Sequence, residues 1–243
     1  MHGVHSPLVY NLIKDVIYNK NLKSPWFTSI EKMRNAFNND YTLIDSIDYG
    51  AASKYKSTHK TIRKICSTTS KSKKYSQLLF RLIKWHNPKY ALELGTSLGI
   101  SAMYQATGLS ENAKLITIEG HEAVALKAKH VIKELNFNSI EVIVGNFDKE
   151  LPKVLNNVPQ LDWVFFDGNH KKEPTLRYFT QCLEKASNNA LFIFDDINWS
   201  DEMREAWIEI KNHPKAYLTI DLFFVGLVLV NKREQKEHFT ILF

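Results

Sequence analysis

Acidic side chains close several apolar runs in the middle of the chain. Glu119 ends "KLITIE", Asp167 ends "LDWVFFD", and Asp195 and Asp196 end "ALFIFDD". Runs of this kind are typical of buried strands, and the carboxyl ends of parallel strands meet at one edge of a sheet. A single acid of this kind could simply cap the following helix, but acids at several strand ends indicate a shared site.

A glycine turn, "ALELGTSLGIS", stands at residues 91–101. Gly95 permits a tight turn after the strand, and Gly99 permits a helix to begin close to a neighbouring group. Glu119 follows Gly95 by 24 residues, a spacing at which an acid can accept both hydroxyls of an adenosine ribose. Taken alone, the stretch indicates either a cofactor site or only a turn between a strand and a helix.

The details of the turn distinguish between two kinds of adenosine cofactor. A dinucleotide needs the pattern G-x-G-x-x-G, in which backbone amides face the pyrophosphate. Here Thr96 and Ser97 replace the central glycine, and Glu93 precedes the turn. A carboxylate at that place would repel a pyrophosphate but suit an ammonium group. The pattern therefore favours an adenosine with a cationic amino-acid tail, which is the chemistry of S-adenosylmethionine.

Strand-like and helical patterns alternate from Tyr90 onward and would position these residues. The strand-like runs are "YALEL", "KLITIE", "SIEVIVG", "LDWVFFD" and "ALFIFDD". Helical patterns follow them, at residues 122–135, 149–155, 174–186 and 202–211. This alternation predicts an α/β domain with a doubly wound, mostly parallel sheet that helices cover on both faces. The tail, 216–243, has no helical pattern between its apolar runs, which predicts an antiparallel finish.

The first third of the chain has a different composition. Ser6 and Pro7 are typical of a helix start, and a second helical pattern begins near Thr28. Residues 48–76 are rich in Ser, Thr and Lys. That composition favours a mobile connector over a loop that orders above a site. We expect a helical cap and connector over residues 1–72, and an S-adenosylmethionine-binding domain over residues 73–243.

Five segments come in the order and spacing of class I S-adenosylmethionine-dependent methyltransferases: "LELGTSLGIS", "LITIEGHEAVALKAK", "IEVIVGNFDKELPKVL", "LDWVFFDGNHKKEPTLRYF" and "LFIFDDINW". The chain most resembles the catechol and caffeoyl-CoA O-methyltransferase group and the related methyltransferase 24 type, over about residues 73–200. "HGVHSPLVYNLI" and "DDINWSDEMREAW" also resemble a bacterial branch associated with Bacteroidetes, which supplies no substrate. The resemblance implies a Rossmann-like, seven-stranded sheet with an antiparallel C-terminal strand.

The resemblance also implies a set of cofactor-binding residues, which are Glu93, Gly95, Thr96, Ser97, Gly99, Glu119, Gly120, His121, Asn146, Phe147, Asp148 and Asp167. The glycine turn would hold the methionine end and Glu119 the ribose, while residues 120–121 and 146–148 would lie on the two sides of the adenine. Asp167 would face the sulfonium. Phe147 could instead be a packing residue at the start of a helix.

A metal site is the point at which the sequence departs from the catechol type. That type holds magnesium with the acid after the fourth strand and an Asp-Asn pair after the fifth. Asp167 and Asp196 match the first two ligands, but Ile197 stands in place of the asparagine and cannot coordinate a metal. Asp195 or Asn198 could substitute, because oxygen ligands suit Mg²⁺ and Ca²⁺. A divalent metal on Asp167, Asp195 and Asp196 stays open; otherwise the last two acids cap the following segment.

His170 and Asp167 are the candidate catalytic residues. Methyl transfer is an in-line displacement at an activated carbon, so orientation and exclusion of water supply much of the catalysis. A hydroxyl acceptor also needs a base, and His170 follows Asp167 by three residues and titrates in the useful range. The catechol type has a lysine at this place. His170 could instead be a surface or capping residue.

Composition limits the partners and the location. The formal charge of +6 comes from 32 Lys and Arg against 26 Asp and Glu, which are mixed at helical spacing, so nucleic acid is an unlikely partner. Cys66 and Cys182 fit no metal or redox spacing and predict reduced thiols. The start lacks a charged leader followed by an apolar stretch, and no run is long enough to span a bilayer. We expect a cytoplasmic protein without a membrane span; a homodimer stays open.

These observations together predict an S-adenosylmethionine-dependent methyltransferase (EC 2.1.1.-) that methylates a hydroxyl of a small molecule. The alternative is a non-catalytic module on the same fold that binds an adenosine cofactor or associates with nucleic acid. A nicotinamide-dependent oxidoreductase would share the fold but lacks the pyrophosphate glycines. The sequence does not name the acceptor, because loops and the N-terminal cap would build its pocket.

Overall fold

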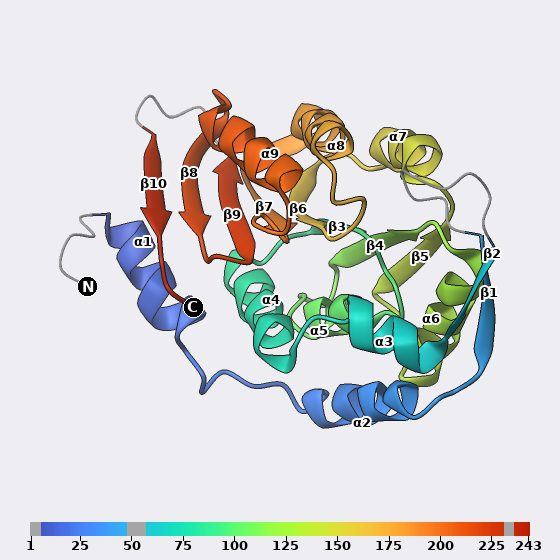
Figure 1. Cartoon of the computed structure of the whole chain (residues 1–243). Coiled ribbons are helices and arrows are strands. Elements are labelled where there is room, and N and C mark those ends of the chain that lie inside the picture. Colours follow the sequence, from blue (N-terminus) through green and yellow to red (C-terminus); the bar gives the residue numbers. More distant parts are fainter. Residues whose placement is uncertain (1–5, 48–56, 231–235) are drawn as a thin grey trace.

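An eight-stranded sheet forms the centre of the molecule in a computed structural model, which describes residues 6–47, 57–230 and 236–243 (Figure 1). The strands lie in the order β10-β8-β9-β7-β6-β3-β4-β5. Their bounds are β3 Tyr90–Leu94, β4 Lys114–Glu119, β5 Ile140–Val144, β6 Leu161–Phe166, β7 Ala186–Asp195, β8 Ala216–Asp221, β9 Val225–Val230 and β10 Glu237–Thr240. The predicted doubly wound, mostly parallel α/β sheet is confirmed.

The C-terminal strands differ in detail from the prediction. The strand that runs antiparallel to both of its neighbours is β9, which inserts between β7 and β8. Both edges of β9 are therefore occupied, and the final strand, β10, pairs with the outer edge of β8, to which it is parallel. This addition raises the expected seven strands to eight.

Helices cover both faces of the sheet (Figure 1). On one face lie α7 (Phe147–Asn157), α8 (Lys172–Glu184) and α9 (Asp201–Asn212), and on the other lie α4 (Lys73–His86), α5 (Ile100–Ala106) and α6 (Glu122–Glu134). Successive residues of a strand point to opposite faces, so Leu92 and Leu94 pack in the cluster of the first group. Ala91 packs in the cluster that includes α4.

The described residues before α4 (6–47 and 57–72) form a layer across the second group of helices. The layer contains α1 (Pro7–Asn11), the π-helix η1 (Leu12–Ile17), α2 (Phe27–Asn38), the antiparallel strands β1 (Leu43–Ile47) and β2 (Ser57–Thr61), and α3 (Ile62–Thr69). The buried Arg81 of α4 donates hydrogen bonds to the carbonyl oxygens of Val16 (2.7 Å) and Ile17 (3.0 Å). These bonds tie η1 to the core. The division at residue 72 stays a prediction.

Part of the expected mobile connector is regular structure. Residues 57–69 form β2 and α3, and residues 73–76 begin α4, while residues 48–56 of that prediction lie outside the described residues. Ile62, Ile65 and Cys66 are buried at i, i+3 and i+4, so α3 has an apolar stripe among its polar residues. Thr61 caps this helix by accepting a hydrogen bond from the Lys64 amide (3.1 Å). Ordering of this segment on ligand binding stays a prediction.

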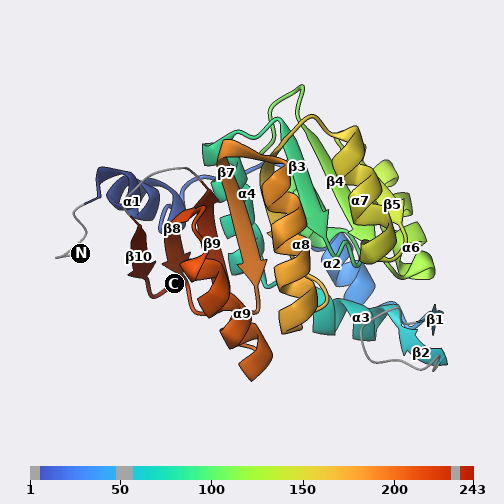
Figure 2. The same ribbon diagram turned by 90° about the horizontal axis from the view of Figure 1, so that it is seen from above.

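The carboxyl ends of the central strands lie close to the segment between α3 and α4. Seen from above, the arrowheads of β3 and β7 point to the same edge, along which α3 lies (Figure 2). Thr69 and Ser97 join their hydroxyl groups at 2.6 Å across this boundary. The fold therefore places the connector between α3 and α4 over the carboxyl ends of the central strands.

Candidate active site

A cavity of about 600 Å³ opens at the carboxyl ends of the strands. It is large enough for a nucleoside cofactor and part of an acceptor. Its walls come from the α3–α4 connector and from the segments after five strands, with the lining residues Thr68–Lys71, Gly95, Ser97, Glu119–His121, Asn146, Phe147, Asp167–His170, Tyr178, Asp196 and Trp199. Most of the residues that the sequence predicts for the site are thus brought together.

The glycine turn packs directly against the backbone after β6. Gly95 has a φ of +107°, and a Cβ atom there would lie 2.2 Å from the carbonyl oxygen of Asp167. No side chain fits that space, and few side chains adopt that φ. The amide of Gly95 donates to the carbonyl oxygen of Ile118 (3.0 Å), which fixes the turn beside β4. Gly99 begins α5 with a φ of +81° and does not line the cavity.

Glu119 connects the turn after β3 with the turn after β4. Its carboxylate accepts hydrogen bonds from the backbone amides of Ser97 (2.8 Å) and His121 (2.9 Å). Two amide donors fix the orientation of the carboxylate in the wall of the cavity. This is the place at which the sequence predicts an acceptor for ribose hydroxyls.

His121 holds an unused donor at the cavity. Its Nδ1 atom accepts the hydrogen bond from the Val124 amide (3.3 Å) that caps α6. In the neutral ring the proton is therefore on Nε2. That atom is buried and has no hydrogen-bond partner within the described parts of the chain. A buried donor without a partner costs stability, and a ligand acceptor in the cavity would satisfy it.

Asn146 and Phe147 line the cavity from the start of α7. The Asn146 side chain caps α7 by accepting from the Asp148 amide (2.7 Å). The Phe147 ring meets the Tyr178 ring edge-on at 5.8 Å and lies so close to Gly168 that a Cβ atom there would be 2.7 Å from it. Phe147 therefore both packs and lines the cavity. The Asp148 carboxylate bonds to the Tyr178 hydroxyl (2.8 Å) and does not line the cavity.

Glu93 and Thr96 lie beneath the turn and do not line the cavity. Glu93 is fully buried and accepts hydrogen bonds from Gln105 Nε2 (2.7 Å) and Thr117 Oγ1 (2.6 Å). Thr96 and Thr117 share a hydrogen bond of 2.6 Å. Burial raises the pKa of Glu93 to about 7, against the hydrogen bonds that lower it. In this structure Glu93 supports the turn, and its direct contact with a ligand stays a prediction.

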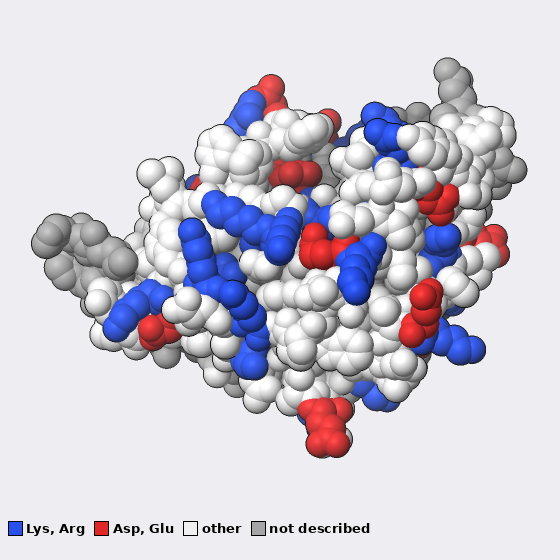
Figure 3. Space-filling model, turned by 90° about the horizontal axis from the view of Figure 1, so that it is seen from below, with Lys and Arg blue, Asp and Glu red and all other residues white. Residues whose placement is uncertain are grey.

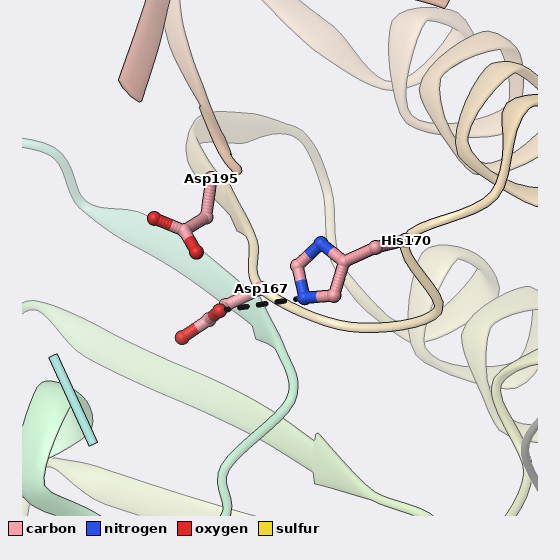
Figure 4. A group of neighbouring side chains, drawn as sticks. All are labelled: Asp167, His170 and Asp195. Atoms are coloured by element: carbon pink, nitrogen blue, oxygen red, sulfur yellow. Dashed lines mark ion pairs between the residues drawn. The ribbon is translucent and has the colours of Figure 1, made fainter. Parts of the chain in front are cut away.

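A cluster of charged groups occupies the other end of the cavity. Figure 4 shows Asp167 and His170 facing one another, with Asp195 beside them. His170 Nε2 lies 3.9 Å from Asp167 Oδ1 and 3.8 Å from Asp196 Oδ2. The ammonium of Lys71 lies 3.0 Å from Asp167 Oδ1 and forms a second ion pair with Asp195 Oδ2. The segment between α3 and α4 thus places the ammonium of Lys71 between the ends of β6 and β7.

Burial and unequal charge shift the pKa values in this cluster. Burial raises the pKa of Asp167 well above its usual range and that of Asp195 to about 6, because one ammonium does not compensate two enclosed carboxylates. Burial opposes the charge on Lys71, but the acids around it raise its pKa overall. Burial lowers the pKa of His170, while Asp196 pulls it upward. The net shift below the ordinary value of 6.5 favours the neutral imidazole, which can accept a proton.

The residues present do not fit the divalent metal that the catechol type implies. One donor atom each from Asp167, His170 and Asp195 lie within 4.8 Å of one another. However, Lys71 already pairs with both carboxylates. Ile197 is fully buried in the apolar cluster beneath α7–α9 and supplies no ligand. We therefore assign no step to a metal.

Among the lining residues that the sequence did not predict, three bear on the chemistry of the site: Lys71, Tyr178 and Trp199. Lys71 lies in a segment whose many lysines are typical of a solvated surface, and nothing local distinguishes it. Tyr178 reaches the cavity from α8, where its spacing is that of an ordinary core residue. Trp199 lines the mouth of the cavity with 75 % of its surface exposed. A large exposed aromatic residue just after a strand-end acid pair is a signal that could have found it.

Comparison with known proteins finds a matching domain over part of the chain and a shared fold. Residues 92–197 match a family described as "Methyltransferase domain", of the methyltransferase 24 type. A catechol O-methyltransferase from Niastella koreensis is 30% identical over 128 residues, which are 51% of this chain and 55% of the relative. A transmembrane O-methyltransferase homolog from Rattus norvegicus is 32% identical over 80 residues, 32% of this chain and 31% of the relative. The chain thus spans between 31% and 55% of the length of these relatives.

Solved structures share the fold over more of the chain. An O-methyltransferase from Bacillus cereus in complex with SAH has a TM-score of 0.62 and 20% identity, covering 92% of this chain and 97% of that one. The O-methyltransferase TomG from Streptomyces achromogenes in complex with SAM has a TM-score of 0.59 and 22% identity, covering 67% and 82%. At these identities the likeness establishes the Rossmann-like fold.

Proposed function

We propose that this chain, which has the domain and the fold of class I S-adenosylmethionine-dependent methyltransferases, transfers a methyl group to a hydroxyl of a small molecule. The observation that carries the proposal is a single cavity with two chemical ends. One end joins the glycine turn, Glu119 and the unpaired donor of His121; the other places His170 beside Asp167. The names of the O-methyltransferase relatives support a hydroxyl acceptor.

The first end of the cavity suits S-adenosylmethionine, which supplies a methyl carbon activated by a sulfonium. The missing side chain of Gly95 lets the amino-acid end approach the backbone. Glu119, oriented by two amides, would accept the ribose hydroxyls. His121 Nε2 would donate to an adenine nitrogen, and the Phe147 ring would pack against the adenine. Structures of the same fold in complex with SAM or SAH support this assignment.

The second end suits proton removal from the acceptor. Neutral His170 accepts the hydroxyl proton on Nε2, and the acceptor oxygen attacks the methyl carbon in line. The new bond between oxygen and carbon forms as the bond between carbon and sulfur breaks, and the electron pair of that bond goes to sulfur. Asp167 lines the cavity beside His170 and would face the sulfonium, because a carboxylate favours positive charge. Lys71, Asp167 and Asp195 are largely enclosed, which would limit the access of water to the reacting atoms.

Isothermal titration with S-adenosylmethionine and S-adenosylhomocysteine tests the first part of the proposal. Wild type and the control Glu111→Gln, an exposed residue away from the cavity, should bind both ligands. Glu119→Ala and Gly95→Val should weaken binding by at least tenfold. Thermal unfolding of each variant distinguishes lost binding from lost folding. Absence of heat with either ligand in the wild type would contradict the proposal.

The acceptor class is tested by transfer of a radiolabelled methyl group from S-adenosylmethionine to catechols and to other small hydroxyl compounds. Product on a hydroxyl, lost in His170→Gln, is the expected outcome. Methylation at nitrogen or carbon only would overturn the choice of a hydroxyl. The comparisons lend no support to the non-catalytic module.

Partners and location are proposals of the same kind. On the face in Figure 3, Lys and Arg side chains are interspersed with Asp, Glu and uncharged surface, which supports leaving nucleic acid out of the proposal. No helix in the described ranges is long and apolar enough to cross a membrane. Cys66 and Cys182 are both free and buried, which supports the proposal of a reducing cytoplasm.

A further inference from the structure

The ammonium of Lys71 lies between the two strand-end carboxylates that, with His170, could otherwise hold a metal ion. It lies 3.0 Å from Asp167 Oδ1 at the end of β6 and pairs with Asp195 Oδ2 at the end of β7. Its side chain is 17 % exposed, and the two carboxylates are 9 % and 3 % exposed. Lys71 is therefore an enclosed partner of both acids, unlike a surface lysine that swings into solvent.

The surrounding chain holds this lysine in place. Arg34 of α2 donates to the carbonyl oxygen of Lys71 at 2.7 Å, and Ser76 Oγ donates to the same oxygen at 3.3 Å. Two residues before Lys71, Thr69 bonds to Ser97 of the glycine turn at 2.6 Å. The connector that carries Lys71 is thus fixed from the N-terminal layer and from the cofactor end of the cavity.

The charge pattern of the sequence fits a dedicated cation. Between Asp48 and Glu93 the chain has many Lys and Arg residues and no Asp or Glu. The segment that covers the acids of β6 and β7 therefore brings no competing carboxylate. A second cation placed on Asp167 and Asp195 would be repelled by the ammonium already there.

An ammonium has three N–H donors. Two of those on Lys71 serve Asp167 and Asp195, and the third has no acceptor among the residues that the structure describes. Lys71 also lines the cavity, together with His170. A ligand oxygen in the cavity could therefore accept the third hydrogen bond within reach of the imidazole.

We propose that Lys71 takes the place of a divalent metal in this site and is a catalytic residue that binds the acceptor oxygen. As His170 takes the hydroxyl proton and the bond from oxygen to the methyl carbon forms, the third N–H of Lys71 stabilises the charge that develops on that oxygen. The electron pair of the breaking carbon–sulfur bond goes to sulfur. The catalytic part rests on the proposed function, whereas occupation of the metal position does not.

Binding of Mn²⁺, followed by electron paramagnetic resonance without cofactor or acceptor, tests the occupation alone. Wild type and the control Lys73→Met, an exposed lysine two residues further along, should bind no Mn²⁺ in the site. Lys71→Met keeps the length of the side chain but removes the charge, so Asp167, Asp195 and His170 should then bind one Mn²⁺. The double variant Lys71→Met, Asp195→Asn should lose that ion again.

Two outcomes would overturn the occupation: stoichiometric Mn²⁺ on the wild type that Asp195→Asn abolishes, or a folded Lys71→Met protein that gains no ion. Thermal unfolding and S-adenosylhomocysteine binding establish that each variant is folded. With an acceptor from the panel above, Lys71→Met should lower kcat by about a hundredfold, and EDTA should leave the wild-type rate unchanged. A Lys71→Met enzyme with wild-type kcat would overturn the catalytic part. Failure of methyl transfer in the wild type leaves the Mn²⁺ result decisive.

Discussion

The guanidinium of Arg34 donates a 2.7 Å hydrogen bond to the backbone carbonyl oxygen of Lys71, whose own ammonium pairs with two strand-end acids. Arg34 Nε in turn bonds to Glu31 at 3.1 Å, and the Tyr104 hydroxyl donates to the same carboxylate oxygen at 2.8 Å. Helix α2 thereby positions the backbone of Lys71, while the ammonium of Lys71 contacts the two strand-end acids.

Arg34→Ala should therefore impair the acceptor end while leaving the cofactor end intact. We expect kcat to fall by about tenfold and the affinity for S-adenosylhomocysteine to stay within about twofold. Methyl-transfer kinetics and calorimetry check the two halves of this prediction. Lys32→Ala on the same helix, where the side chain is exposed, serves as the control. Equal losses in cofactor affinity and kcat would show a general structural defect instead.

The rate of methyl transfer should depend on pH through His170. Burial lowers the pKa of His170, Lys71 lowers it further, and Asp196 opposes both. Only the neutral imidazole accepts a proton, so kcat/KM should rise with pH, with an inflection below the ordinary value of 6.5, and level off near neutrality. His170→Gln should remove this limb and lower the rate by about a hundredfold. An unchanged limb in His170→Gln would assign the titration to another group.

Glu93 should make folding stability fall as pH rises. Its pKa is raised from 4.5 in the ordinary state to about 7 in the fold, so the folded protein holds the proton more tightly than the unfolded chain. The favourable contribution is complete below pH 4.5 and is lost as pH rises toward 7. Glu93→Gln does not titrate; its side-chain oxygen can still accept from Gln105 Nε2, and its NH₂ group can donate to the Thr117 hydroxyl oxygen. From pH 5 to 8 it should gain up to about 3 kcal/mol of unfolding free energy relative to wild type. Urea titrations at both pH values measure this; parallel changes in the two proteins would contradict it.

Two substitutions at His121 separate its two roles. Asn at this position can still cap α6 but lacks the buried Nε2 donor, whereas Phe loses both functions. His121→Asn should weaken S-adenosylhomocysteine binding by about tenfold with little change in Tm. His121→Phe should lower the affinity and the Tm together. Calorimetry and thermal unfolding are the measurements; full affinity in His121→Asn would show that the donor faces no ligand atom.

Trp199 should act on the acceptor alone. Its ring lines the mouth of the cavity and is largely exposed. Trp199→Ala should raise the acceptor KM by about tenfold and leave cofactor affinity unchanged, because the loss is of packing against the acceptor. Ile208→Ala, an exposed apolar residue of α9, is the control. Loss of cofactor binding in Trp199→Ala would place the ring at the other end of the cavity.

The acids at the strand ends could be predicted because a parallel sheet brings its carboxyl ends together whatever the loops do. The side-chain direction of Glu93 was also within reach, since Leu92 and Leu94 pack on one face of the sheet and the residue between them must point to the other. Lys71 was not: 124 residues separate it from Asp195, and no local pattern marks one lysine among many. The parallel pairing of β10 with β8 was not predictable either, because it depends on the insertion of β9 between β7 and β8.

The contact between Gly95 and the carbonyl oxygen of Asp167 makes the two halves of the cavity mechanically dependent. Any side chain at position 95 must displace the backbone of Asp167. Its carboxylate then moves relative to Lys71. A substitution of Gly95 should therefore impair acceptor chemistry as well as cofactor binding. No side chain at this position should change one of these two properties alone.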